Sequence, residues 1–137
     1  MRYHERLSGP LLDRVDLFLE TRSLEYEKLR ERPNSECSAD IRARVNAARE
    51  VQLKRYRDCA LRCNAHIGPK QIELFCGLSS ECEKLMRSAF RALSMTARSY
   101  DRILRVARTI ADLEGAECIA PAHLAEAIQY RQFAFRK

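Results

Sequence analysis

TARSYDRILRVARTIADLEG, residues 96–115, carries a regular helical pattern in this chain of 137 residues. Its apolar side chains recur every three or four positions and so fall on one face of an α-helix. They are Tyr100, Ile103, Leu104, Ala107, Ile110 and Ala111. Thr96 is a favourable N-cap, and Gly115 is a favourable residue just beyond the C-terminal end. Two i,i+4 ion pairs are expected on the outer side of this helix, and they are Asp101–Arg105 and Arg108–Asp112.

Outward from this helix, capping residues and apolar periodicity predict four more helices. The first spans residues 38–57, with Ser38 as its N-cap, and a loop over residues 58–68 follows. Its expected apolar face consists of Ile41, Val45, Ala48, Leu53 and Tyr56. The other three are a short helix from Pro69 to near Gly77, a helix from Ser79 or Ser80 to near Leu93, and a last helix opened by Pro121. Residues 37–137 are therefore predicted to form one small helical bundle.

The first 36 residues have a different pattern. Residues 14–20, RVDLFLE, alternate partly and are rich in strand-forming side chains, so they predict a short strand. Residues 23–36 are charged and contain Pro33-Asn34-Ser35, which is typical of a linker. The strand is expected to belong to a sheet whose other strands are not in this chain. The predicted fold class is mainly α, with a strand and linker before the bundle.

Composition narrows the class of protein. Hydrophobic residues make up 46% and charged residues 32%, which is typical of a globular domain, and four glycines and four prolines are too few for an all-β fold. No apolar run is long enough to cross a membrane, and the charged N-terminus does not resemble a signal peptide, so a cytoplasmic location is expected. The net charge of +6 suits phosphate partners, nucleotide or nucleic acid, although solvated arginine-rich faces give the same composition.

The six cysteines are Cys37, Cys59, Cys63, Cys76, Cys82 and Cys118. A disulfide framework is disfavoured because no secretory signal is seen. A zinc site from Cys59, Cys63, His66 and Cys76 lacks the tight Cys-x2-Cys pair, so free thiols, several of them buried, are expected instead and no metal site is predicted. His4, His66 and His123 have no nucleophile or acid at a recognisable spacing, which favours surface or capping roles over hydrolysis.

Five segments carry a resemblance to a known family. They are RLSGPLLDRVD at 6–16, SADIRARVNAAREVQ at 38–52, CNA at 63–65, RVARTIADLEG at 105–115 and HLAEAIQYR at 123–131. In order and spacing they resemble the C-terminal part of magnesium-chelatase-related AAA+ ATPases, and most closely the ComM family of bacterial competence proteins. True chelatase I subunits and minichromosome-maintenance helicases resemble this order of segments less closely. The resemblance covers almost the whole chain and implies a helical lid domain, also called the sensor-2 domain.

The family also implies what this chain lacks. No Gly-x4-Gly-Lys-Ser/Thr run occurs in it, so the P-loop, the acidic magnesium-binding motif and sensor 1 are expected in a preceding part of a longer parent. That parent is expected to use ATP and Mg²⁺, whereas the fragment alone is expected to hold no cofactor and to be inactive. Cys59, Cys76, Cys82 and Cys118 are outside the family pattern.

The resemblance assigns roles to two arginines. Arg14 is the candidate arginine finger, which neutralises charge on the γ-phosphate of a neighbouring subunit. The alternative is a surface arginine paired with Asp13 or Asp16. Arg98, in the first turn of the helix over residues 96–115, is the candidate sensor-2 residue, where the helix dipole also favours phosphate. Whether Arg98 serves the nucleotide of its own subunit or of its neighbour stays open.

Three functions are compatible with these observations. The first is a lid of a hexameric, homo-oligomeric ring ATPase that moves DNA, as in branch migration, with the missing core and neighbouring subunits as partners. The second is a lid of a chelatase motor that drives metal insertion into a tetrapyrrole. The third is a free-standing basic helical module that binds nucleic acid, which requires a basic stripe on one element. No membrane partner is expected for any of them.

Overall fold

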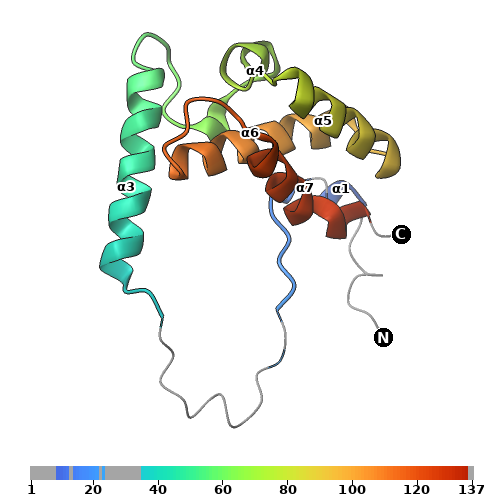
Figure 1. Cartoon of the computed structure of the whole chain (residues 1–137), viewed down its shortest axis with the longest axis horizontal. Coiled ribbons are helices and arrows are strands. Elements are labelled where there is room, and N and C mark those ends of the chain that lie inside the picture. Colours follow the sequence, from blue (N-terminus) through green and yellow to red (C-terminus); the bar gives the residue numbers. More distant parts are fainter. Residues whose placement is uncertain (1–8, 13, 22, 24–34, 136–137) are drawn as a thin grey trace.

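The chain is mainly helical in its computed structural model, which describes residues 9–12, 14–21, 23 and 35–135 (Figure 1). The elements in order are α1 (Gly9–Leu12), α3 (Ser38–Arg55), the 3-10 helix η2 (Asn64–His66), α4 (Pro69–Phe75), α5 (Ser80–Ala92), α6 (Ala97–Leu113) and α7 (Pro121–Phe135). The predicted helical bundle and its five main helices are confirmed. In the part of the chain that the structure describes, no helix is both long and apolar enough to cross a bilayer.

Helix α6 is the centre of the bundle. It packs against α3, η2, α4 and α7, while α5 packs on α7. The predicted apolar face of α6 is confirmed, since Ile103, Leu104, Ala107 and Ala111 are fully buried. Because α6 has neighbours on several sides, a second side is buried as well, with Arg108 and Asp112 each only 3% exposed. The prediction that the Arg108–Asp112 pair lies on the outer side is therefore wrong.

Helix α3 is bound to the bundle by one half only. The helix is confirmed, but it ends at Arg55, and its N-cap is Cys37 rather than the predicted Ser38. The predicted apolar face is only partly right: Ala48 and Tyr56 are buried, whereas Ile41, Val45 and Leu53 are exposed. The N-terminal half of α3 extends past the other helices in Figure 1, and Ile41 and Val45 in this half are each 43% exposed. Periodicity alone predicts which residues share a face, and it does not predict whether another element reaches that face.

Two turns fix where α6 begins and ends. Gly115 has φ 72°, and the bonds Gly115 N–H to Asp112 O (3.2 Å) and Ala116 N–H to Ala111 O (2.8 Å) form a Schellman motif. The same pattern follows α5, where Ser94 takes the left-handed conformation with φ 47°. Thr96 then caps α6, its Oγ1 accepting the Ser99 N–H at 3.2 Å. The caps predicted at Thr96 and Gly115 are confirmed.

The N-terminal segment differs from its prediction. The described residues 14–21 contain no strand, so the predicted strand is wrong for this structure. A strand needs a partner ladder, and the described part of the chain offers only one isolated bridge, between Leu78 and Ile119. The segment instead lies on the bundle, and the Phe18 N–H donates to Tyr130 O of α7 at 2.8 Å. Residues 24–34 of the predicted linker lie outside the described residues, and the division at residue 36 stays a prediction.

Candidate functional site

Arg98 lies where the sequence places it, in the first turn of α6. Its side chain is exposed and makes no hydrogen bond or ion pair with the residues that the structure describes. The backbone N–H groups of this turn point out of the helix end, and they add a partial positive charge beside the guanidinium. The start of α6 therefore presents a guanidinium and a helix N-terminus in the same place, a combination that suits an anion.

Arg14 is also exposed, and its backbone is held against α6. The Arg14 carbonyl accepts a hydrogen bond from Arg102 Nη1 at 3.0 Å. Arg102 lies one helical turn after Arg98 on the same side of α6, about 6 Å further along the axis. The structure thus brings the segment of Arg14 to the side of α6 that carries Arg98. The Arg14 side chain itself makes no bond with described residues.

The proposed pairing of Arg14 with Asp16 is not observed. The Asp16 carboxylate instead bonds Arg102 Nη1, the nitrogen that also holds the Arg14 carbonyl. Asp13, the other partner considered for Arg14, lies outside the described residues. One of the two acids that could have neutralised Arg14 is therefore engaged elsewhere.

Arg131 of α7 is the second anchor of the segment, and sequence reasoning missed it. It is completely buried, its Nη1 donates to the Val15 carbonyl, and its Nη2 lies 3.5 Å from Ser99 Oγ next to Arg98. Its guanidinium also lies 5.9 Å from the centre of the Phe18 ring. A signal was present, because Arg131 follows Leu124 and Ile128 at helical spacing on the apolar face of α7. We call residues 14–18 with Arg102 and Arg131 the arginine clamp.

The arginine clamp predicts slow amide exchange within residues 14–18. The Phe18 amide should be protected, since it is bonded to Tyr130 O. Replacing Arg102 by Gln should raise the exchange rate of the Phe18 amide about tenfold or more, because the bonds from Arg102 to Arg14 and Asp16 are lost. Hydrogen exchange read by NMR checks this, with Arg105→Gln as the control on the same helix. A Phe18 amide that exchanges at the unprotected rate in the unmodified chain contradicts the clamp.

A buried polar network holds the loop after α3. The Asp112 carboxylate accepts from Arg55 at 2.5 and 2.9 Å, from Arg108 Nε at 3.1 Å and from Asn64 Nδ2 at 2.8 Å. Asn64 Oδ1 in turn accepts from the Tyr56 hydroxyl at 2.5 Å. One carboxylate thus joins α3, η2 and α6. Arg55 and Asn64 were not predicted to meet it, since they come from separate elements.

Electrostatics explains how this carboxylate stays charged inside the protein. Burial by itself raises the pKa of Asp112, but hydrogen bonds from Arg55 and Asn64 and the charge of Arg108 outweigh it, and the pKa lies below its ordinary value. The bond to Asp112 raises the pKa of Arg55 in return. Arg108 also donates to the carbonyls of Ala116 and Glu117, so the network fixes the turn after α6. The bonds of the network hold α3, η2 and the turn after α6 together, while the Arg55 side chain stays 19% exposed.

The free thiols and the capping role of His123 agree with the sequence predictions. All six thiols are free, with Cys76 and Cys82 buried, and burial raises the pKa of Cys76 to about 11. The described residues contain no cluster of three metal-ligating side chains. His123 is a capping residue, as its Nδ1 accepts the Ala120 N–H at 3.0 Å and its Nε2 lies 2.8 Å from the Glu114 carboxylate. His4 lies outside the described residues.

Comparison with known proteins shows the family to which the chain belongs. Residues 35–131 match the family described as magnesium chelatase, subunit ChlI C-terminal. The chain belongs to this magnesium chelatase C-terminal family. Arg98, Arg131 and the Asp112 network fall inside the matched range of the ChlI C-terminal domain, and Arg14 falls before it.

The curated relatives that the chain matches are longer than the chain itself. The chain is 42% identical to the competence protein ComM of Haemophilus influenzae and 40% identical to YifB of Escherichia coli, each over 96% of this chain and 25% of the relative. An uncharacterised protein of Mycobacterium tuberculosis is 34% identical over 99% of this chain and 27% of its own length. The chain therefore spans about a quarter of the length of these relatives. Because each of the first two alignments covers 96% of the chain, the aligned part includes Arg14.

Proposed function

We propose that this chain is the lid domain of a magnesium-chelatase-related AAA+ ATPase, and that Arg98 and Arg14 bind phosphate oxygens of ATP. The observation that carries the proposal is the arginine clamp. It fastens the segment of Arg14 beside α6 while leaving the side chains of Arg14 and Arg98 exposed and unbonded among the described residues. Two uncompensated guanidiniums on one structural unit match the charge of a nucleotide phosphate.

The residues present fit part of an ATP site. A guanidinium offers several donors in a fixed fork, which suits the terminal phosphate oxygens of ATP. The P-loop amides and the magnesium-binding acids are not in this chain and belong to the proposed core. ATP with Mg²⁺ supplies a phosphoryl group whose developing negative charge the two arginines would stabilise. Arg14 is proposed to reach the nucleotide of the neighbouring subunit in a homo-oligomeric ring, a hexamer.

An apolar groove next to the arginine clamp supports a docked core. The groove has a volume of about 440 Å³ between residues 16–19, α6 and α7. Leu17, Leu19 and Leu113 line it and are 48%, 74% and 40% exposed. Arg105 also lines it, and its Nε is buried without an acceptor among the described residues. Exposed apolar side chains and an unmatched donor are what a domain interface leaves when its other half is absent.

DNA remodelling in competence or recombination is the activity proposed for the whole protein. It is supported by the 42% identity to a protein named for competence, and by the net charge of +6. A chelatase motor is the second candidate, and the family description, magnesium chelatase subunit ChlI, favours it. In both cases the lid couples ATP hydrolysis to work done elsewhere in the ring.

ATP hydrolysis by the longer protein distinguishes the two candidates. Single-stranded DNA should raise the steady-state rate severalfold, whereas protoporphyrin with Mg²⁺ should leave it unchanged, because only a polymer substrate loads the motor. The 137-residue chain serves as the control and should hydrolyse no ATP. Stimulation by the porphyrin alone selects the chelatase, and turnover by the chain itself rules out the lid assignment.

A further inference from the structure

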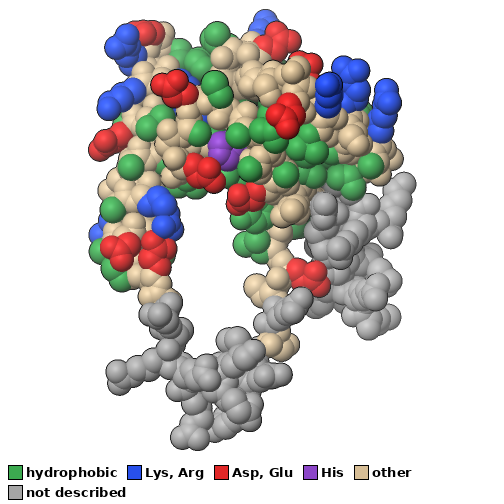
Figure 2. Space-filling view, viewed as in Figure 1, with side chains coloured by type: hydrophobic (Ala, Val, Ile, Leu, Met, Phe, Trp, Pro, Cys, Tyr) green, Lys and Arg blue, Asp and Glu red, His purple; other side chains and the backbone are tan. Residues whose placement is uncertain are grey.

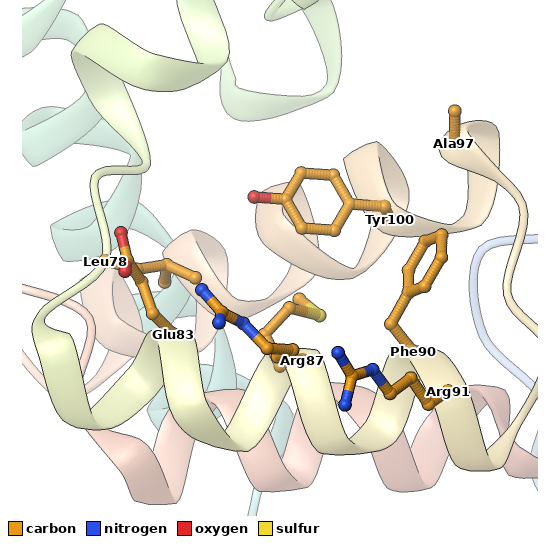
Figure 3. Close-up of a pocket in the computed structure, with 8 residues that line it drawn as sticks. Leu78, Glu83, Arg87, Phe90, Arg91, Ala97 and Tyr100 are labelled. Atoms are coloured by element: carbon orange, nitrogen blue, oxygen red, sulfur yellow. The ribbon is translucent and has the colours of Figure 1, made fainter.

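A groove between α5 and the start of α6 has no role in the function proposed so far. It has a volume of about 500 Å³ and is shown in Figure 3. Its apolar side consists of Leu78, Met86, Phe90 and Tyr100. Phe90 and Tyr100 stand edge to face with their ring centres 6.4 Å apart, and Phe90 is 39% exposed. The Phe90 ring is thus partly open to solvent inside the groove.

Cations border this groove. Arg87 and Arg91 line it and also line a second hollow on the outer side of α5, which Lys84 enters as well. At about 100° per residue the three cations fall within about 60° of one another around α5. They are exposed and make no ion pair with described residues. Figure 2 shows Lys and Arg side chains gathered at this outer edge of the molecule.

The one acid of the groove is Glu83, which also lines the second hollow, and the Arg87 side chain extends toward it in Figure 3. Glu83 lies at the Leu78 end, while Arg91 and Phe90 lie together at the Ala97 end (Figure 3). From Lys84 to Ala92 the helix contains no acidic residue. A positive row therefore runs alongside an exposed aromatic ring for the last two turns of α5.

We propose that this groove binds single-stranded nucleic acid, with phosphates on Lys84, Arg87 and Arg91 and a base stacked on Phe90. The proposal rests on the proposed function and names a part of its DNA-binding surface. Charge complementarity supports it, since a row of free cations beside a π-face is the arrangement that single-stranded nucleic acid requires. An acidic peptide would use the cations and leave the aromatic ring without a matching partner.

The cation row is tested with the chain itself and a fluorescent twelve-residue oligo-dT at low salt. Arg87→Glu with Arg91→Glu should weaken binding about tenfold or more, and the slope of log K against log salt should fall by about 1.4. Arg42→Glu with Arg49→Glu on α3 removes the same charge from another exposed surface and should weaken binding less than threefold. Equal loss in both double variants overturns the proposed site.

The aromatic side is tested separately. Phe90→Leu keeps the apolar volume but removes the π-face, so affinity for oligo-dT should fall about tenfold. Affinity for an abasic strand of equal length, which has the same phosphates and no bases, should not change. If the unmodified chain binds the abasic strand or poly-glutamate as tightly as oligo-dT, the groove is a site for polyanions or acidic peptides and the proposal fails.

These outcomes are independent of ATP. If the chain binds oligo-dT but the longer protein shows no DNA-stimulated ATPase activity, the proposed groove stands and the proposed DNA motor is rejected. If the longer protein is a DNA-stimulated ATPase but the chain binds no oligo-dT, only the proposed groove is rejected.

Discussion

Replacing Arg14 by Ala in the longer protein should lower kcat for ATP hydrolysis by about 10³-fold or more, the size of effect that arginine fingers have elsewhere. The fold should be unaffected, because the Arg14 side chain makes no hydrogen bond or ion pair with described residues and its carbonyl is what Arg102 holds. Arg98→Ala should also abolish most activity. Steady-state ATPase assays on purified rings give both values, and Arg42→Ala on exposed α3 is the matched control.

The two arginines should differ when subunits are mixed. Arg14→Ala subunits combined with P-loop mutant subunits should regain part of the activity, because one mixed interface joins an intact phosphate cradle to an intact finger. The same mixture made with Arg98→Ala reports whether Arg98 acts within its own subunit or across the boundary. If mixed rings form and the Arg14→Ala mixture stays inactive, Arg14 does not act in trans. Full activity of Arg14→Ala rings would falsify the finger assignment.

Removing the Asp112 carboxylate should destabilise the chain by about 3–5 kcal/mol, because the buried Arg108 and the half-buried Arg55 would lose their shared counter-ion. Urea unfolding of Asp112→Ala followed by far-UV circular dichroism measures this. Asp112→Asn keeps the shape and should lose less, so it gives a value even where the alanine variant does not fold. Asp101→Asn lies on the same helix, makes no bond with described residues and should change the free energy of unfolding by under about 0.5 kcal/mol.

The pH dependence of unfolding provides a second readout of Asp112. Because its pKa is lowered in the folded state, its contribution is complete above the unfolded pKa of about 3.9 and is lost as the pH falls through the folded pKa. The difference in stability between the unmodified chain and Asp112→Asn should therefore shrink in acid. A difference that stays constant from neutral pH to below pH about 3 would show that the carboxylate is not perturbed.

Local signals predicted the helices well. Thr96 and Gly115 mark the ends of α6, and its apolar face follows directly from a period of three to four residues. These features depend on neighbours in sequence, so the sequence contains them in full. The family resemblance then indicated which exposed arginines to consider, and the structure finds both Arg14 and Arg98 exposed beside α6.

Long-range relations were not predictable in the same way. Arg55 and Asp112 are 57 positions apart, and Arg131 and Val15 are 116 apart, so no local spacing connects them. The strand expected at residues 14–20 failed for a related reason. Alternation indicates that a segment can be extended, but only a neighbouring strand makes it part of a sheet. Ile41 and Val45 show the converse, an apolar helix face whose covering element is not among the described residues.

The arginine clamp ties the segment of Arg14 to α6, the helix that carries Arg98. Since one nitrogen of Arg102 holds the carbonyl of Arg14, a movement of α6 would be passed on to the backbone of Arg14. A lid that closes on its own nucleotide through Arg98 would therefore also advance or withdraw the finger offered to the next subunit. If the chain works in a ring as proposed, such a link would couple hydrolysis in neighbouring subunits, with Arg102 and Arg131 as its two anchors.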